Sequence, residues 1–251
     1  MKKAIALIIT AVLLLSLCSC SDKPEQKKSS ETKAAETTAP ETTTEAKKVE
    51  TLNGIDVSAY SGDIDWSGVK TDFVMVRLGG RGYGDEGSLY SDNKAADYIS
   101  GAQAAGIKTG GYFFSQAITE DEAREEAQYC QQVLGGLKLD FPLAYDWEII
   151  KDDDARTDSL TAEQATSCAL AFCAKAKELG YKPMLYASDE EFSKKYDMSR
   201  LSDCDVWYCE YADEPHFPYR FSMWQYSKTA TVDGIEGNAD LDLCFTNMAD
   251  Y

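Results

Sequence analysis

Apolar and polar positions follow two different periods along residues 51–251. Short apolar runs, rich in β-branched and aromatic residues, have the length of strands, and the segments between the early runs repeat their apolar residues every three to four positions, as helices do. The runs predict eight strands, at residues 54–58, 73–79, 108–114, 141–149, 182–187, 205–211, 221–227 and 239–245.

Helical spacing is found in three segments, residues 92–106, 119–134 and 161–179. The second and third begin with a threonine that is followed three residues later by Glu or Gln, a pair typical of a capped helix start. Each of the three segments ends at a glycine, which is typical of a helix stop.

The alternation of strands and helices predicts a mainly parallel sheet. A regular eightfold β/α barrel needs ~250 residues, whereas about 200 are present here, and the last three strands leave no room for full helices between them. We therefore predict an α/β fold, an irregular TIM-like β/α barrel with eight strands and fewer helices. An open doubly wound sheet is the alternative.

The first 20 residues have the pattern of an export signal. Lys2 and Lys3 precede an apolar run from Ala4 to Leu17 that is too short for a comfortable membrane span. The run ends in L-C-S-C, which resembles a bacterial lipobox, so we expect cleavage before Cys20 and lipidation of that cysteine. The protein would then be anchored to the outer face of the bacterial cytoplasmic membrane. Ordinary secretion of an unanchored product is the alternative.

Residues 21–50 have the composition of a tether. Thr, Glu, Lys, Ser and Ala dominate, no aromatic residue occurs, and large aliphatic residues are almost absent. Such a segment buries too little apolar surface to offset the entropy lost on ordering. We expect a disordered linker between the anchor and a catalytic domain at residues 51–251.

The charge of the domain excludes one class of partner. Of the chain's acidic residues 36 lie in residues 51–251, against 17 of its basic residues, whereas the linker is nearly neutral. Phosphate binding needs a basic surface. We therefore expect no nucleic-acid partner, no membrane contact other than the lipid anchor, and a monomer.

Cysteine and histidine usage argues against metal or thiol chemistry. The domain contains six cysteines without any C-x-x-C spacing, and the only histidine is His216, between prolines in E-P-H-F-P. This pattern lacks the spacing of a zinc site. We expect no metal and no cofactor. Whether Cys204 and Cys209 form a disulfide is left open.

Two acids on one predicted strand are the strongest chemical signal. In L-A-Y-D-W-E-I, Asp146 and Glu148 stand two positions apart and so face the same side of a strand. Asp56 and Asp240 lie at the same rim of the predicted barrel, where such folds place their sites. Candidate substrate-binding residues at that rim are Tyr60, Arg77, Tyr112, Phe114, Tyr186, Trp207, Tyr211, Trp224 and Gln225.

Paired carboxylates among aromatic rings are typical of glycoside hydrolysis. The motifs point the same way, because their order along the chain resembles glycoside hydrolase family 25, the muramidase-type lysozymes. The matching motifs are G-I-D-V-S-A-Y (54–60), I-D-W (64–66), G-Y-F-F (111–114), D-W-E (146–148), P-M-L-Y (183–186), W-Q-Y (224–226) and G-I-E-G-N-A-D-L-D (234–242).

The resemblance implies cleavage of the β-1,4 bond between N-acetylmuramic acid and N-acetylglucosamine in peptidoglycan. It assigns the general acid to Glu148, the neighbouring carboxylate to Asp146, and two further site aspartates to Asp56 and Asp240. The chain departs from the family pattern at Y-S-G (60–62), where a Gln is usual, and at Asp242, where an Asn is common. These departures leave the substrate preference open.

The mechanism is not fixed by spacing. Strand positions i and i+2 lie ~6.6 Å apart, between the ~5–5.5 Å of retaining and the ~6.5–9.5 Å of inverting carboxylate pairs. We favour substrate assistance, in which the 2-acetamido group of the sugar attacks and Asp146 orients it. The alternatives to a muramidase are a catalytically inactive wall-binding lipoprotein, a lipoprotein whose acids bind cations, and a hydrolase of another N-acetylglucosamine polymer.

Overall fold

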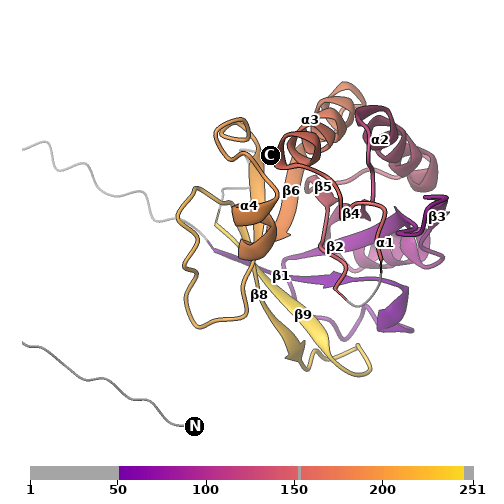
Figure 1. Cartoon of the computed structure of the whole chain (residues 1–251). Helices are drawn as coiled ribbons and strands as arrows, with labels where there is room; N and C mark the ends of the chain where they lie inside the picture. Colours follow the sequence, from indigo (N-terminus) through magenta and orange to yellow (C-terminus); the bar gives the residue numbers. More distant parts are fainter. Residues whose placement is uncertain (1–50, 152–153, 246–251) are drawn as a thin grey trace, which may run out of the picture. The chain divides into compact units, whose positions relative to one another are not determined.

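Eight strands close into a barrel in this computed structural model, which describes residues 51–151 and 154–245 (Figure 1). The sheet runs in the order β1-β9-β8-β7-β6-β5-β4-β2, and pairing of β1 with β2 closes it. The barrel strands are β1 (Leu52–Val57), β2 (Phe73–Arg81), β4 (Lys108–Phe114), β5 (Leu143–Asp146), β6 (Pro183–Ser188), β7 (Asp205–Cys209), β8 (Met223–Ala230) and β9 (Ala239–Cys244).

All neighbouring strands are parallel except at β9, which is antiparallel to both β8 and β1. The predicted irregular barrel is confirmed, and the open sheet is excluded by the β1–β2 pairing. A ninth strand, β3 (Leu89–Ser91), pairs with the end of β2 outside the barrel and was not predicted. The expected signal and linker, residues 1–50, lie outside the described residues.

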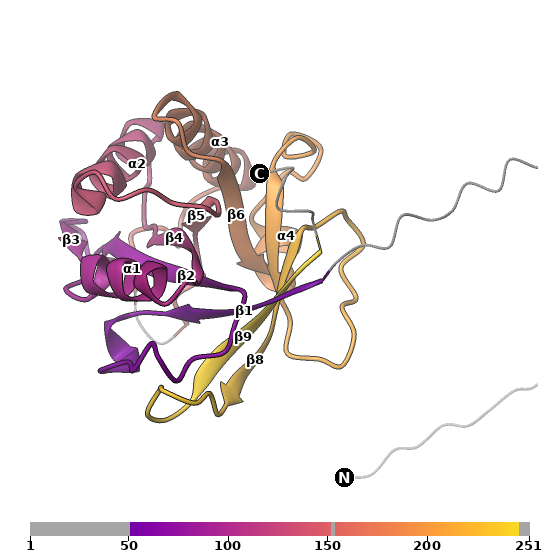
Figure 2. The same ribbon diagram turned by 180° about the vertical axis from the view of Figure 1, so that it is seen from behind.

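Helices cover only part of the barrel. The three predicted helices form as α1 (Ala95–Ala104), α2 (Glu120–Leu134) and α3 (Ala162–Glu178), and they pack on β2, β4, β5 and β6. Figures 1 and 2 show no helix over β8 and β9. The short α4 (Asp189–Lys194) and a 3-10 turn at Ala59–Ser61 are additional. Within the described residues no helix is both long and apolar enough to span a bilayer.

The helix ends follow the sequence signals. The side chain of Thr119 accepts a hydrogen bond from the Glu122 amide at 3.2 Å, and Gly135 ends α2 in the left-handed conformation at φ 56°. Thr161 and Gln164 form a reciprocal capping box at the start of α3. These local contacts satisfy backbone groups that a helix end leaves without partners.

Alternation along the strands separates two cores. Outward-facing side chains such as Val74 and Val76 pack under the helices in the larger core. Inward-facing side chains fill the closed end of the barrel, and this inner core consists of Phe73, Met75, Phe141, Ala144, Met184, Trp207, Met223 and Cys244. Because the same alternation continues along each strand, the next inward positions lie at the opposite, open end of the barrel.

The six cysteines of the domain are all free thiols. Cys209 is buried, whereas Cys204 is half-buried in the loop before β7. The disulfide between Cys204 and Cys209 that the sequence left open is therefore absent from the structure.

Candidate active site

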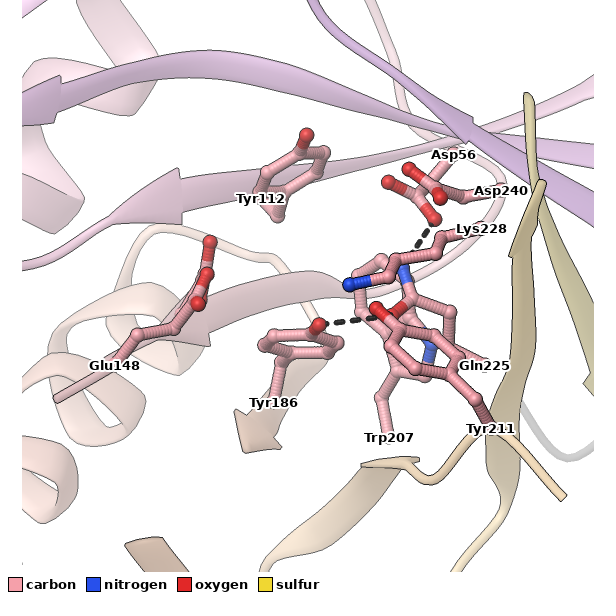
Figure 3. A pocket seen from close by; sticks show the side chains of 10 residues that line it. Asp56, Tyr112, Glu148, Tyr186, Trp207, Tyr211, Gln225, Lys228 and Asp240 are labelled. Atoms are coloured by element: carbon pink, nitrogen blue, oxygen red, sulfur yellow. Dashed lines mark hydrogen bonds between the residues drawn. The ribbon is translucent and has the colours of Figure 1, made fainter. Parts of the chain in front are cut away.

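A cavity of about 220 Å³ opens at the carboxyl ends of the parallel strands (Figure 3). Four carboxyl groups and four aromatic rings share its wall with one amide and one amine. The lining residues are Asp56, Tyr112, Asp146, Glu148, Tyr186, Trp207, Tyr211, Gln225, Lys228 and Asp240. The four predicted catalytic acids are thus brought together, with five of the nine predicted substrate-binding residues.

The strand directions explain this convergence. Asp56 lies near the carboxyl end of β1, whereas Asp240 lies near the amino end of β9. Because β9 runs antiparallel to β1, the start of β9 reaches the same rim, and Asp56 and Asp240 are direct partners in the register. Two acids 184 positions apart in the chain therefore share one side of the cavity, opposite Glu148 (Figure 3).

The segment that carries Asp146 and Glu148 is only partly a strand. β5 ends at Asp146, and Glu148 follows in an irregular segment, so the predicted strand at 141–149 was too long. Both acids still line the cavity because Trp147 between them is buried on the other side, in edge contact with Tyr196. The amide of Gln116 also donates to the Glu148 carbonyl at 3.4 Å, which helps to fix the turn after β5.

Asp146 and Glu148 are neighbouring acids on one wall of the cavity. Their interaction raises the pKa of Asp146 and opposes the rise in the pKa of Glu148, so in the free protein it favours a proton on Asp146. Burial, then the charge of Glu148, raises the pKa of Asp146 well above its ordinary value. The Glu148 side chain contacts solvent, but the surrounding cavity walls partly desolvate its carboxyl, and this desolvation, then the charge of Glu191, also raises its pKa. Asp146 is 4% exposed and its Oδ1 has no hydrogen-bond partner in the described chain, whereas Glu148 is open to solvent.

Gln225 is the centre of a hydrogen-bond network on the side of the cavity opposite Glu148. Its Oε1 accepts hydrogen bonds from the Tyr186 hydroxyl at 2.9 Å, the Cys209 thiol at 3.1 Å and the Tyr211 hydroxyl at 3.2 Å. Three donors on the oxygen orient the amide nitrogen toward Asp56, and Nε2 donates to Asp56 Oδ2 at 2.6 Å. The network fixes the direction of Asp56 and leaves its second oxygen for other partners.

Asp242 is buried below the cavity and interacts with Asp56. Its Oδ1 accepts a hydrogen bond from Trp207 Nε1 at 2.8 Å, and its Oδ2 has no hydrogen-bond partner among the described residues. Burial, then the charge of Asp240, raises the pKa of Asp56 to about 8. Burial, then the charge of Asp56, raises the pKa of Asp242 well above its ordinary value. A protonated Asp242 offers one donor and one acceptor, as the asparagine expected at this position would.

Four of the predicted substrate-binding residues do not line the cavity. Trp224 neighbours Gln225 on β8, so its ring faces outward, where Nε1 donates to the Glu210 carbonyl at 2.8 Å. Arg77 pairs with the buried Asp92 at 2.9 Å, and its guanidinium lies 4.8 Å from the ring centroid of Tyr60. The other two are the exposed Tyr60 itself and the half-buried Phe114.

Lys228 is the lining residue that the sequence analysis did not single out. It lies on β8 three residues after Gln225, beyond a register shift between Gln225 and Ser227. Simple alternation does not predict the side of a residue past such an irregularity. The signal available in the sequence was a lysine near the end of a predicted strand, followed by the acids Asp233, Glu236 and Asp240.

Neither a histidine-based catalytic site nor a metal site is seen among the described residues. His216 is exposed and lies 2.9 Å from Glu210, and it does not line the cavity. Within the described residues no group of three or more His, Cys, Asp or Glu side chains is arranged to hold a metal ion. The polar groups at this site are four carboxyls, one amide, one amine and the hydroxyls of three tyrosines.

Comparison with known proteins gives consistent matches. The chain is 29% identical over 195 residues to an autolytic lysozyme of Clostridium acetobutylicum, covering 76% of this chain and 55% of that protein. It is 25% identical over 202 residues to lysozyme M1 of Streptomyces globisporus, covering 75% of this chain and 66% of that protein. The chain thus spans between about half and two thirds of the length of these two relatives.

The fold matches a solved structure as well. The crystal structure of the spore cortex lytic enzyme SleM of Clostridium perfringens superposes with a TM-score of 0.68 at 24% identity, covering 80% of this chain and 69% of that chain. The sequence model described as "Glycosyl hydrolases family 25" matches residues 55–235, which include three of the four cavity acids. The chain belongs to glycosyl hydrolases family 25.

Proposed function

We propose that this protein is an N-acetylmuramidase, which hydrolyses the β-1,4 bond between N-acetylmuramic acid and N-acetylglucosamine in peptidoglycan. Membership of the family supports a glycoside hydrolase, and the two relatives are both named lysozymes. The cavity of about 220 Å³ is smaller than the ~300–1,000 Å³ typical of a drug-sized ligand. It suits one sugar ring of a longer strand.

One observation carries the proposal: the Asp146 and Glu148 carboxyls lie together on one wall of the cavity. Glycoside hydrolysis needs a carboxylic acid that is still protonated near neutral pH and an anionic group beside it. Burial of both groups raises both pKa values, so the pair retains a proton at a pH where an exposed glutamate has lost it.

The roles follow from exposure. Glu148 is open to solvent and is the group that a glycosidic oxygen can reach, so Glu148 donates the proton. Asp146 is enclosed and has one oxygen without a partner, which makes it an acceptor for the N–H of a 2-acetamido group. A hydrogen bond from that N–H favours the ionised form of Asp146, and the proton of the pair then moves to Glu148.

The reaction then proceeds in two steps. The acetamido oxygen attacks the anomeric carbon, and the Glu148 proton moves to the departing oxygen, while ionised Asp146 stabilises the cyclic cation that forms. Water next opens the ring from the side that the leaving sugar vacated, and Glu148 takes up its proton. Two inversions give net retention of the anomeric configuration.

Aromatic side chains form the floor of the cavity. Tyr186 and Tyr112 both meet the ring of Trp207 edge-on, with centroids 4.6 Å and 5.8 Å apart. Packed rings hold their positions without losing further rotamer entropy when a sugar binds. The neighbouring Asp240 adds negative charge where the sugar cation develops, whereas Asp56, with its pKa raised to about 8, is protonated near neutral pH.

The test uses the purified domain and defined peptidoglycan. Mass spectrometry of the fragments identifies the new reducing end, which should be N-acetylmuramic acid, and NMR of the first product should show the β-anomer. A reducing end of N-acetylglucosamine would contradict the muramidase, and hydrolysis of chitin oligomers alone would indicate another polymer. A first-formed α-anomer would rule out retention.

Glu148→Gln separates an enzyme from a wall-binding protein. The amide keeps the size of the side chain but has no acidic proton, so turnover should fall by ~10²–10⁴-fold, the usual contribution of a general acid. Glu163→Gln on the exposed face of α3 is the matched control and should keep full activity. Wall digestion by Glu148→Gln at the wild-type rate would show that Glu148 is not the acid.

We further propose that the chain is exported and anchored through a lipid on Cys20. The support is the sequence alone: a basic start, a short apolar run and the L-C-S-C end. Cys20→Ala should remove the lipid-anchored form, so that the protein is released into the medium or accumulates as uncleaved precursor. Cys18→Ala should leave the anchored form unchanged. Equal membrane retention of Cys20→Ala would contradict the anchor.

A further inference from the structure

Lys228 stands on the wall between two neighbouring cavities. The first is the active-site cavity, and the second, of about 420 Å³, is lined by the loop after β7 and the end of β8. Tyr211 and Lys228 line both cavities, so the two form adjoining parts of one surface depression. Figure 3 shows the Lys228 amine reaching from the side of Asp240 toward the middle of the first cavity.

The ammonium group of Lys228 has unused hydrogen-bonding capacity. Its Nζ lies 4.9 Å from the ring centroid of Tyr211, a cation–π contact that holds the chain in place. In the described part of the chain, no hydrogen bond or ion pair engages this Nζ. An ammonium carries three N–H donors, and all three are free for a ligand.

The surrounding charge restricts what that ligand can be. Lys228 is the one basic side chain among the residues lining the two cavities, against the four acids of the first cavity and Asp213 in the second. A negatively charged group is disfavoured beside the ionised acids of this surface. At the shared wall it meets the ammonium group of Lys228, which favours a carboxylate there.

We propose that Lys228 binds a carboxylate of the substrate and thereby selects glycans that carry one. The inference rests on the proposed function, since the muramoyl residue carries a lactyl group at its 3-position. That carboxyl is free in a peptide-free strand and forms an amide where a stem peptide is attached, and the peptide then supplies carboxylates of its own. Both sources present the same chemistry to Lys228, with the sugar in the first cavity and the acid at the shared wall.

A counter-ion role is the competing explanation, because burial raises the pKa values of Glu148 and Asp240 and the charge of Lys228 partly offsets that rise. The two explanations differ in what they affect. A counter-ion acts on the enzyme's own acids, so its loss changes hydrolysis of every glycan by the same factor. A carboxylate site acts on the ligand, so its loss matters only for substrates that carry the charge.

The experiment compares three glycans of equal length with Lys228→Met, Lys228→Arg and the wild type. The lactyl groups are free carboxylates in the first, neutral carboxamides in the second, and linked to stem peptides in the third. For Lys228→Met we expect about a tenfold loss of kcat/KM on a glycan whose carboxylate Lys228 binds, and no loss on the carboxamide glycan. The loss should arise mainly from a higher KM, as for one lost charge-assisted contact. Lys228→Arg should keep most of the activity, and the loss should shrink at high salt.

The pattern of losses identifies the source of the carboxylate. A loss of kcat/KM confined to the glycan with free lactyl carboxylates indicates that Lys228 binds the lactyl group. A loss confined to the peptide-bearing glycan indicates that it binds the stem peptide. An equal loss on all three glycans, or no loss on any, overturns the inference. Lys177→Met, which removes the same charge from the exposed face of α3, is the control and should behave as the wild type.

A binding measurement keeps this inference separate from the proposed function. The disaccharide of N-acetylglucosamine and N-acetylmuramic acid is titrated against its lactyl carboxamide by NMR, with no cleavage needed. If the wild type cuts none of the glycans, the muramidase fails, while the inference is still judged by binding. Tighter binding of the carboxylate by the wild type but not by Lys228→Met supports it, and equal binding by both proteins overturns it.

Discussion

Replacing Asp56 with asparagine should change how the stability of the domain depends on pH. Asp56 is 7% exposed, and burial with the charge of Asp240 raises its pKa from 3.8 to about 8. Between these two values the folded state holds a proton that the unfolded chain has released. The free energy of unfolding therefore falls as pH rises through this interval.

The size of the effect follows from the shift. Each pH unit inside the interval removes ~1.4 kcal/mol of stability, so a rise of three units removes ~4 kcal/mol. The cavity is open to water, and the ionisation of Asp56 depends on its acidic neighbours Asp240 and Asp242, so we expect about half of this, ~2 kcal/mol. The asparagine side chain of the variant cannot ionise, and its carbonyl can still accept from Gln225. Relative to the wild type, Asp56→Asn should thus gain ~2 kcal/mol across the interval.

Urea unfolding, followed by tryptophan fluorescence, measures the free energy of unfolding of Asp56→Asn and of the wild type at about pH 4.5 and about pH 7.5. The quantity of interest is the difference in unfolding free energy between variant and wild type at each pH, so a constant effect of the substitution cancels. Asp85→Asn, in an exposed turn, is the control and should give the same difference at both. If Asp56→Asn also gave the same difference within ~0.5 kcal/mol, Asp56 would not be held protonated in the fold.

Three further outcomes test the site. Asp146→Asn should lower kcat on wall glycan by ~10²-fold or more, because an amide cannot stabilise the sugar cation, and activity equal to the wild type would refute substrate assistance. Burial raises the pKa of Glu148, so kcat/KM should fall on the alkaline side as Glu148 loses its proton. A fall centred at the ordinary glutamate value would contradict this raised pKa. Trp224→Phe removes the hydrogen bond to the Glu210 carbonyl and should cost ~1 kcal/mol of stability in urea unfolding with kcat unchanged.

The elements were predictable to the extent that their signals are local. The eight barrel strands and α1–α3 were found because apolar periodicity and capping residues act within one segment. β3 and α4 were missed, since β3 forms through its pairing with the end of β2 and α4 is only six residues long. β5 was extended too far because Trp147 and Ile149 continue the apolar run after the sheet pairing has ended.

The candidate site shows the same limit. Asp56, Tyr112 and Asp146 were placed correctly because alternation fixes the inward side of a regular strand. Trp224 was expected at the site together with its neighbour Gln225, although adjacent strand residues face opposite sides. Lys228 was overlooked because the register shift in β8 breaks the alternation that would have assigned its side.

The sequence by itself determined the barrel, the family resemblance and the identity of the four acids, because these depend on residue type and on spacing along one segment. Only the tertiary structure decided which carboxyl groups lie beside one another and which charges face them. Asp242 beneath Asp56, Glu191 near Glu148 and Lys228 near Asp240 come from separate parts of the chain. The pKa of a carboxyl depends on burial and on charges a few ångströms away, and the closing of the barrel sets both.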